Sequence, residues 1–237
     1  MNSVYEYKSS HGEVKDVDTK KGIVMGYFAQ FGSKDADNDV IQQGAFLKTI
    51  KENGPGSDNN RIKHLLNHTP GQPLGKIITL KEDNIGLYYE SKIGTHALGV
   101  DFLKMVDSEI INEHSIGYKT ISESKKSDST IGDYNLLSEL KLWEGSSLTA
   151  WGANEYTPLL GVKSFNYDAL THKIASMEKF IRNSDATDET IELLQIQLKQ
   201  LQQYIIDLQS TTKAANAPEP EKKEDSLLIF YKHIKIN

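Results

Sequence analysis

The sequence contains no cysteine, and this absence narrows the chemistry available to the protein. Without cysteine there is no disulfide framework, no thiol nucleophile and no thiolate metal site. No segment approaches the roughly 20 consecutive apolar residues needed to span a bilayer, and the polar stretch from Met1 to Lys21 lacks the apolar core of a signal peptide. We therefore expect a protein that is made and kept in the cytosol, or inside a particle assembled there.

Arginine is also scarce, with Arg61 and Arg182 as its two occurrences, and the formal net charge is -6. Acidic and basic residues are interspersed, so the total charge argues for solubility and favours neither a nucleic-acid partner nor an anionic membrane. The chain of 237 residues is long enough for one large domain or for a catalytic domain with an appendage. An apolar content of 38% favours a modest core with a polar extension.

The first half of the chain has the pattern of a β-rich domain. Segments rich in β-branched and aromatic residues alternate with turn residues at hairpin spacing, which predicts antiparallel strands. The predicted strands cover residues 22–31, 62–66, 74–80 and 85–93. A short helix is predicted over residues 44–52, where it meets the helix-breaking stretch from Asn53 to Ser57.

A further helix and a strand pair are predicted next. Residues 96–107 carry apolar side chains at helical spacing, and residues 115–122 and 136–143 alternate as paired strands do. Because strand side chains repeat every two residues, Leu140, Leu142 and Glu144 are predicted to share one face. A carboxylate that continues an apolar row draws attention to Glu144.

The pattern changes after about residue 165, where apolar residues recur at intervals of three and four. These residues are Leu170, Ile174, Met177 and Ile181, then Ile191, Leu194, Leu198, Leu201, Ile205 and Leu208. They predict two helices separated near Asn183–Asp185, with Thr187 or Asp188 as the N-cap of the second. Plain core packing, a helical hairpin and a coiled coil with another chain all fit the seam, and a hairpin or a bundle with partner chains is favoured.

The resulting domain organisation has four parts. We expect a polar N-terminal segment (1–21), a compact domain (22–164), a helical hairpin or coiled-coil extension (165–210), and a flexible linker and tail (211–237). The linker is rich in Ala, Pro, Glu and Lys, a composition typical of disordered segments.

Two short segments carry the residues for nucleophilic catalysis. One is Asn67-His68, beside a predicted turn, and the other is the stretch Glu113 to Tyr118, which contains Ser115. A serine hydroxyl is a weak nucleophile until a neighbouring imidazole takes its proton, so a serine and a histidine from separate segments are the parts that acyl transfer requires. Taken singly, a histidine beside a turn is more often a solvated or capping residue, and a serine in a strand usually has no catalytic role.

The surrounding motifs make the pair specific. They are Gly26-Tyr27, Phe31-Gly32, Gly44-Ala45-Phe46, Asn67-His68, Pro73-Leu74-Gly75 and Ser115-Ile116-Gly117-Tyr118. Over roughly residues 20 to 160, this series resembles the prohead proteases of tailed bacteriophages, the HK97 family, which are similar to the herpesvirus proteases. The resemblance implies an α+β fold, a mainly antiparallel β-barrel ringed by helices, followed here by the helical extension.

By this resemblance Ser115 is the nucleophile and His68 the general base of a serine endopeptidase. The family's acidic motif reads Leu142-Trp143-Glu144-Gly145-Ser146 in this chain, which makes Glu144 the third member that orients His68. The sequence departs from the usual Glu-Val-Ser-Leu-Val pattern at Gly145 and Ser147. Glu139 is therefore a rival, and His96 and His114 are others because the herpesvirus enzymes use a second histidine.

Two other site assignments remain open at this stage. His64 and His68 are four residues apart and, with His96 or His114, could be imagined as a zinc site, but this spacing suits a helix and residues 62–66 predict a strand. The oxyanion hole has no sequence signature, since neither Arg61 nor Arg182 lies in a matching motif, and backbone N–H groups are the expected donors. Gly117 is expected to let the backbone approach a substrate closely.

The resemblance also implies a biological setting. The substrates would be the scaffold, or the scaffold-like part of the major capsid protein, and the enzyme's own C-terminal tail, cut inside the assembling prohead in the host cytoplasm. No cofactor is needed for this chemistry, and self-association as a dimer or through the coiled coil is expected. The charge, the lack of long apolar runs and the histidine spacing predict no nucleic acid, no membrane and no metal. The rival function is a catalytically silent scaffold that keeps the barrel and works through its coiled coil, and a metal-dependent hydrolase is a further alternative.

Overall fold

A computed structural model of the chain describes residues 6–10, 14–18, 22–35, 37–111, 113–149 and 167–215. Of the flexible linker and tail predicted over residues 211–237, residues 211–215 instead continue the last helix, and residues 216–237 lie outside this description, as do residues 150–166. The described chain divides into two compact units, with the boundary between Lys199 and Gln200 in the last helix.

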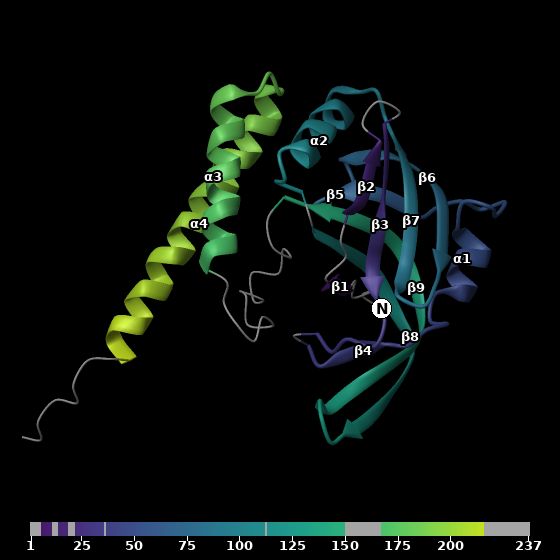
Figure 1. Ribbon diagram of the computed structural model, residues 1–237. Coiled ribbons are helices and arrows are strands. Elements are labelled where there is room, and N and C mark those ends of the chain that lie inside the picture. The colour runs from purple at the N-terminus through teal and green to yellow at the C-terminus, as the bar shows by residue number, and fades with distance from the viewer. Residues whose placement is uncertain are drawn as a thin grey trace, which may run out of the picture. The chain divides into compact units, whose positions relative to one another are not determined.

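Within the described ranges, one nine-stranded mixed sheet curls into a nearly closed barrel (Figure 1). The strands are β1 (Glu6–Ser10), β2 (Val14–Asp18), β3 (Ile23–Gln30), β4 (Asp39–Ile41), β5 (Lys63–Leu66), β6 (Pro73–Glu82), β7 (Gly86–Ile93), β8 (Glu113–Asp128) and β9 (Gly132–Leu148). Their order is β1-β8-β9-β5-β6-β7-β3-β2, and β4 pairs with β9. The pairs β5–β9 and β4–β9 are parallel, and the other six pairs are antiparallel. The mainly antiparallel α+β barrel predicted from the sequence is confirmed.

The helices are α1 (Leu47–Asn53), α2 (Ala97–Asp107), α3 (Tyr167–Asn183) and α4 (Asp188–Ala215). Both α1 and α2 contact β6, and α1 also contacts β9, so the two short helices flank the barrel (Figure 1). All four were predicted, because each carries apolar side chains at helical spacing. The structure also contains β1, β2 and β4, which the sequence pattern did not predict.

Aromatic residues fill the barrel interior around β3. The Phe28 ring stacks on the Tyr89 ring with centroids 3.8 Å apart, and both rings are fully buried. The flat stack is possible because Gly145 of β9 has no side chain: a Cβ there would meet the Phe28 ring at 2.4 Å. Residue 145 therefore faces the core, and this fixes which neighbouring residues of β9 face outward.

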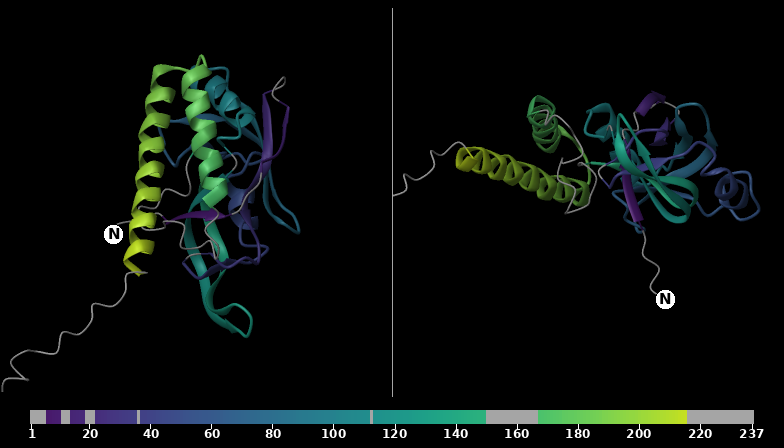
Figure 2. Two further views of the ribbon diagram at one scale, coloured as in Figure 1. Left: turned by 60° about the vertical axis from the view of Figure 1, so that its left-hand side comes forward. Right: turned by 90° about the horizontal axis from the view of Figure 1, so that it is seen from below.

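The chain reverses direction between α3 and α4 (Figure 2). From Leu170 to the end of α3, where side-chain burial is described, the buried residues are Leu170, Lys173, Met177 and Phe180. The buried stripe thus includes a lysine and a phenylalanine that the predicted seam omitted. Burial lowers the pKa of Lys173, although the charge of Glu113 opposes that shift. Coiled-coil pairing with another chain stays a prediction.

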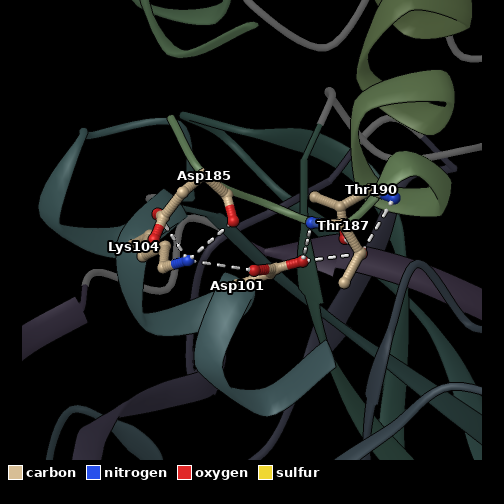
Figure 3. Close-up of polar contacts among 5 residues, drawn as sticks. All are labelled: Asp101, Lys104, Asp185, Thr187 and Thr190. Carbon is tan, nitrogen blue, oxygen red and sulfur yellow. Dashed lines mark hydrogen bonds and ion pairs between the residues drawn. The ribbon is translucent and has the colours of Figure 1, made fainter. Parts of the chain in front are cut away.

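A small polar cluster joins α2 to the start of α4 (Figure 3). Asp101 Oδ2 accepts hydrogen bonds from the amide of Thr187 at 2.8 Å and from its hydroxyl at 2.7 Å. Lys104 Nζ lies 3.4 Å from Asp101 Oδ1 and 2.7 Å from Asp185 Oδ1. Thr187 Oγ1 in turn accepts from the Thr190 amide at 3.4 Å, which makes Thr187 the N-cap, one of the two residues predicted.

Candidate active site

A β-bulge decides where Glu144 points. In the β8–β9 ladder Gly117 pairs with Glu144 but Tyr118 pairs with Leu142, so Trp143 is the extra, unpaired residue. Tyr118 and Leu142 are buried on the core face, whereas Glu144 shares the opposite face with Gly117. The prediction that Glu144 continues the face of Leu140 and Leu142 is therefore wrong, because the bulge shifts the alternation by one residue.

His68 occupies a tight turn directly after β5. Both Asn67 (φ 51°) and His68 (φ 56°) have left-handed backbone conformations, which are uncommon for residues other than glycine. Asn67 is fixed through its side chain, whose Oδ1 accepts from the Thr149 amide at 3.0 Å and whose Nδ2 donates to Thr149 Oγ1 at 2.8 Å. These hydrogen bonds hold the turn that carries His68 beside the end of β9.

Because β5 runs parallel to β9, with Lys63 beside Glu144 and Leu66 beside Ser147, the turn brings His68 to Glu144. His68 Nδ1 lies 2.6 Å from Glu144 Oε1, and both side chains are about nine-tenths buried at 10% and 9% exposed. An ionised carboxylate can only accept a hydrogen bond, so this contact places the ring proton on Nδ1. Nε2 is then the nitrogen suited to accept a proton from a nucleophile.

Ser146 contacts both of these residues. Its hydroxyl donates to Glu144 Oε2 at 2.5 Å and accepts from the backbone amide of His68 at 3.1 Å. The side chain is fully buried. Sequence reasoning quoted Ser146 within the acidic motif without giving it a role, and its position two residues after Glu144, on the same strand face, was the signal that could have found it.

Ser115 lies on the same face of the sheet. It pairs with Ser146 in the β8–β9 ladder, and it is 1% exposed. Directly opposed residues of antiparallel strands have Cα atoms about 4.5–5.5 Å apart, so Ser115 is the immediate neighbour of the residue that binds both His68 and Glu144. Three strands and one turn thus bring the sequence-predicted trio to one small region.

Gly117 serves that region in a way the sequence did not reveal. A Cβ at this position would come within 2.4 Å of Glu144 Oε1. The residue therefore leaves room for the carboxylate, and this steric requirement accounts for its being glycine without invoking a substrate.

The other candidate third members lie elsewhere. His114 Nε2 is 2.6 Å from the Tyr89 hydroxyl in the core, His96 Nε2 is 3.0 Å from the Pro73 carbonyl oxygen, and Glu139 pairs with Lys48 at 2.8 Å. Each of these contacts is made away from His68. Of the three rivals and Glu144, the carboxylate of Glu144 is the group found at hydrogen-bonding distance from the His68 ring.

His64 is a core residue. Its Nε2 lies 2.9 Å from Ser147 Oγ, and the rings of Phe28, Tyr89 and Phe102 surround it. Burial holds the pKa of His64 well below its usual value, with the charge of His114 acting in the same direction, so the ring is neutral. Among the described residues, no three His, Asp or Glu side chains are grouped so that they could hold a metal ion.

Comparison with known sequences assigns the chain to a protein family. Residues 10–172, more than half of the chain, match the family described as caudovirus prohead serine protease. The chain belongs to this family. Membership makes it a serine protease of phage capsid maturation, in agreement with the resemblance drawn from its motifs.

This family member is similar to the prohead protease of Enterobacteria phage HK97, with 26% identity over 169 residues that cover 70% of each chain. Among solved structures it is similar to the capsid assembly protease of bacteriophage T4. That likeness has a TM-score of 0.45 at 13% identity, and it covers 61% of this chain and 96% of the T4 chain. In the part of this prohead protease that the structure describes, no helix has both the length and the apolarity to cross a membrane.

Proposed function

We propose that Ser115, His68 and Glu144 act as the catalytic triad of a serine endopeptidase of prohead maturation. The observation that carries this assignment is the 2.6 Å contact between His68 Nδ1 and Glu144 Oε1, made on the sheet face that also holds Ser115. Support for each role comes from this arrangement together with the family's serine chemistry.

The reaction follows from these roles. Ser115 Oγ attacks the carbonyl carbon of the scissile peptide while His68 Nε2 takes the hydroxyl proton, and Glu144 stabilises the imidazolium that results. Collapse of the tetrahedral intermediate breaks the C–N bond, and His68 returns the proton to the leaving amine. Water then attacks the acyl-enzyme with His68 again as base, which releases the acid product and restores Ser115.

The substrates we propose are the scaffold, or the scaffold segment of the major capsid protein, and the C-terminal tail of the enzyme. These proteins meet inside the assembling prohead. The HK97 relative is named a prohead protease, which supports this setting. Self-association of the enzyme, as a dimer or through the heptad seam, belongs to the same proposal and would hold several copies in one shell.

The test is intact mass spectrometry over time on the purified chain, with and without its assembled capsid protein. Wild type is expected to trim the capsid protein or lose its own C-terminal fragment, whereas Ser115→Ala leaves both intact. The matched control is Ser127→Ala, an exposed serine farther along β8, which should cleave like wild type.

Different failures identify different rivals. If wild type with properly assembled capsid protein cuts nothing, the silent scaffold replaces the protease. Cleavage that stops with a chelator and persists in Ser115→Ala would point to a metal-dependent hydrolase, because serine chemistry is indifferent to chelation.

A further inference from the structure

We propose that Ser146 is a positioning residue that holds the general base His68 and the carboxylate of Glu144 in a fixed geometry. The proposal deepens the assignment of Ser115, His68 and Glu144 and rests on it. Ser146 does not need to touch the substrate in this role, since its contacts are to His68 and Glu144.

Four groups form a closed ring of hydrogen bonds: the amide and the imidazole of His68, the hydroxyl of Ser146 and the carboxylate of Glu144. The His68 amide donates to Ser146 Oγ at 3.1 Å, Ser146 donates to Glu144 Oε2 at 2.5 Å, and Glu144 Oε1 lies 2.6 Å from Nδ1 of the same His68. A serine hydroxyl has one proton to give and lone pairs to accept, so it can serve both neighbours at once. If either His68 or Glu144 moves, the hydrogen bond between them and the bond of the moved residue to Ser146 are both disturbed.

The backbone of His68 is the first reason that such a brace is required. A non-glycine residue with φ near 56° is held in a sparsely populated conformation, which persists where surrounding contacts fix it. Asn67 is tied to Thr149, but the amide of His68 itself donates to Ser146. Ser146 therefore acts directly on the residue whose ring must be aimed.

Glu144 is the second reason. Its carboxylate has donors on both oxygens, His68 on one and Ser146 on the other, which prevents rotation about the bond to the carboxyl carbon. Glu144 follows the bulged residue Trp143, where the regular ladder is interrupted. The bulge weakens the backbone constraint on Glu144. The hydrogen bond from Ser146, on the same strand, therefore helps to fix the Glu144 side chain.

A purely structural role for a buried serine is the competing interpretation, and the chain contains its own control. Ser147 is the next residue, is equally buried at 0% exposed, and uses its hydroxyl on His64 in the core. Ser146→Ala and Ser147→Ala remove the same atom from adjacent positions on opposite faces of β9. A structural effect is common to both variants, whereas a positioning effect belongs to Ser146→Ala.

The kinetic test measures kcat and KM on a capsid-protein peptide with the full-length enzyme. Ser146→Ala is expected to lower kcat by about ten- to a hundredfold with little change in KM, as displacement of a catalytic group does. Ser147→Ala should keep kcat within about twofold, even where its thermal stability falls. Ser146→Thr retains the hydroxyl and should recover much of the lost kcat. Equal kcat losses in the two alanine variants, or none in either, would overturn the proposal.

A spectroscopic test separates this inference from the proposed function. In ¹⁵N-labelled protein, the Nδ1 proton of His68 in its hydrogen bond to Glu144 gives a downfield resonance that His68→Gln identifies by removing it. Ser146→Ala is expected to shift or broaden this resonance, whereas Ser147→Ala leaves it in place. An unchanged resonance in Ser146→Ala would overturn the positioning role even if Ser115 proves catalytic. A lost resonance would support it even if Ser115→Ala still cleaves.

Discussion

Gly117 and Glu144 are opposite each other in the β8–β9 ladder, and a Cβ on residue 117 would come within 2.4 Å of Glu144 Oε1. The carboxylate thus occupies the space that any other side chain at position 117 would fill. Because Glu144 also contacts His68 and Ser146, displacing it disturbs both of these hydrogen bonds of the candidate site.

Gly117→Ala is therefore expected to reduce kcat by about tenfold or more, because the added methyl group pushes the carboxylate away from His68. Steady-state cleavage of a capsid-protein peptide measures the effect. Gly71→Ala, in the turn region near His68 but with no atom within 4 Å of the methyl group it would add, should retain wild-type kinetics. Full activity of Gly117→Ala would show that the carboxylate has room to move.

Gly145→Ala is expected to destabilise the fold by about 1–3 kcal/mol, the usual cost of overpacking a core. The Phe28 ring is in the way, at 2.4 Å from the added Cβ. Phe28→Leu, which is destabilising alone, should offset part of the loss when combined with Gly145→Ala. Urea denaturation of wild type, the two single variants and the double variant gives the coupling energy between positions 28 and 145. Strictly additive losses of unfolding free energy would contradict the steric explanation.

Asp101→Ala should loosen the start of α4. The variant removes the acceptor of two hydrogen bonds from Thr187, at an expected cost of about 1–3 kcal/mol. Hydrogen exchange should show the Thr187 amide exchanging much faster than in wild type. Asp107→Ala, at the exposed end of the same helix, is the control and should leave that amide protected.

The same contact predicts a pH dependence. Burial raises the pKa of Asp101, but the hydrogen bonds from Thr187 and Thr190 and the charge of Lys104 together outweigh it and hold the pKa below its usual value. A carboxyl whose pKa is lower in the folded than in the unfolded state stabilises the fold above its unfolded pKa of about 3.9, and this stabilisation disappears as the pH falls through the folded value.

The difference in unfolding free energy between wild type and Asp101→Asn should therefore be constant near neutral pH and shrink below about pH 4. Denaturation curves collected from pH 7 to pH 3 measure it. A difference that grows on acidification would mean that the folded pKa is raised and would contradict the assigned hydrogen bonds.

Sequence patterns predicted most of the long elements because these elements bury a regular apolar face. The seam from Leu170 onward indicated α3 and α4, and alternation indicated β8 and β9. Strands β1, β2 and β4 were missed since they are short and polar or lack alternation. Strands β1 and β4 also pair with distant strands, β8 and β9, whereas β2 pairs with the adjacent β3. Lys173 was also missed, because a lysine is not expected on a buried stripe.

The candidate site was predicted in its residues but not in its construction. Ser115, His68 and Glu144 came from the resemblance to a family, whereas the face of Glu144 was inferred from simple alternation and was wrong. No pattern of residue types announces that Trp143 leaves the ladder, since a bulge depends on pairing with another strand. The parallel pairing of β5 with β9, which brings His68 to Glu144, is likewise a tertiary event.

Strand β9 has a consequence for how this enzyme can evolve. From Glu144 to Ser147 the residues face the candidate active site and the core in turn, and the Phe28 ring leaves no room for a side chain at Gly145. A half-buried strand ordinarily tolerates change at every second position, but these four positions offer no such alternate freedom. In saturation mutagenesis, most substitutions at each of these four consecutive positions should reduce activity or stability. Sequence change in this segment would therefore require compensating substitutions on neighbouring strands.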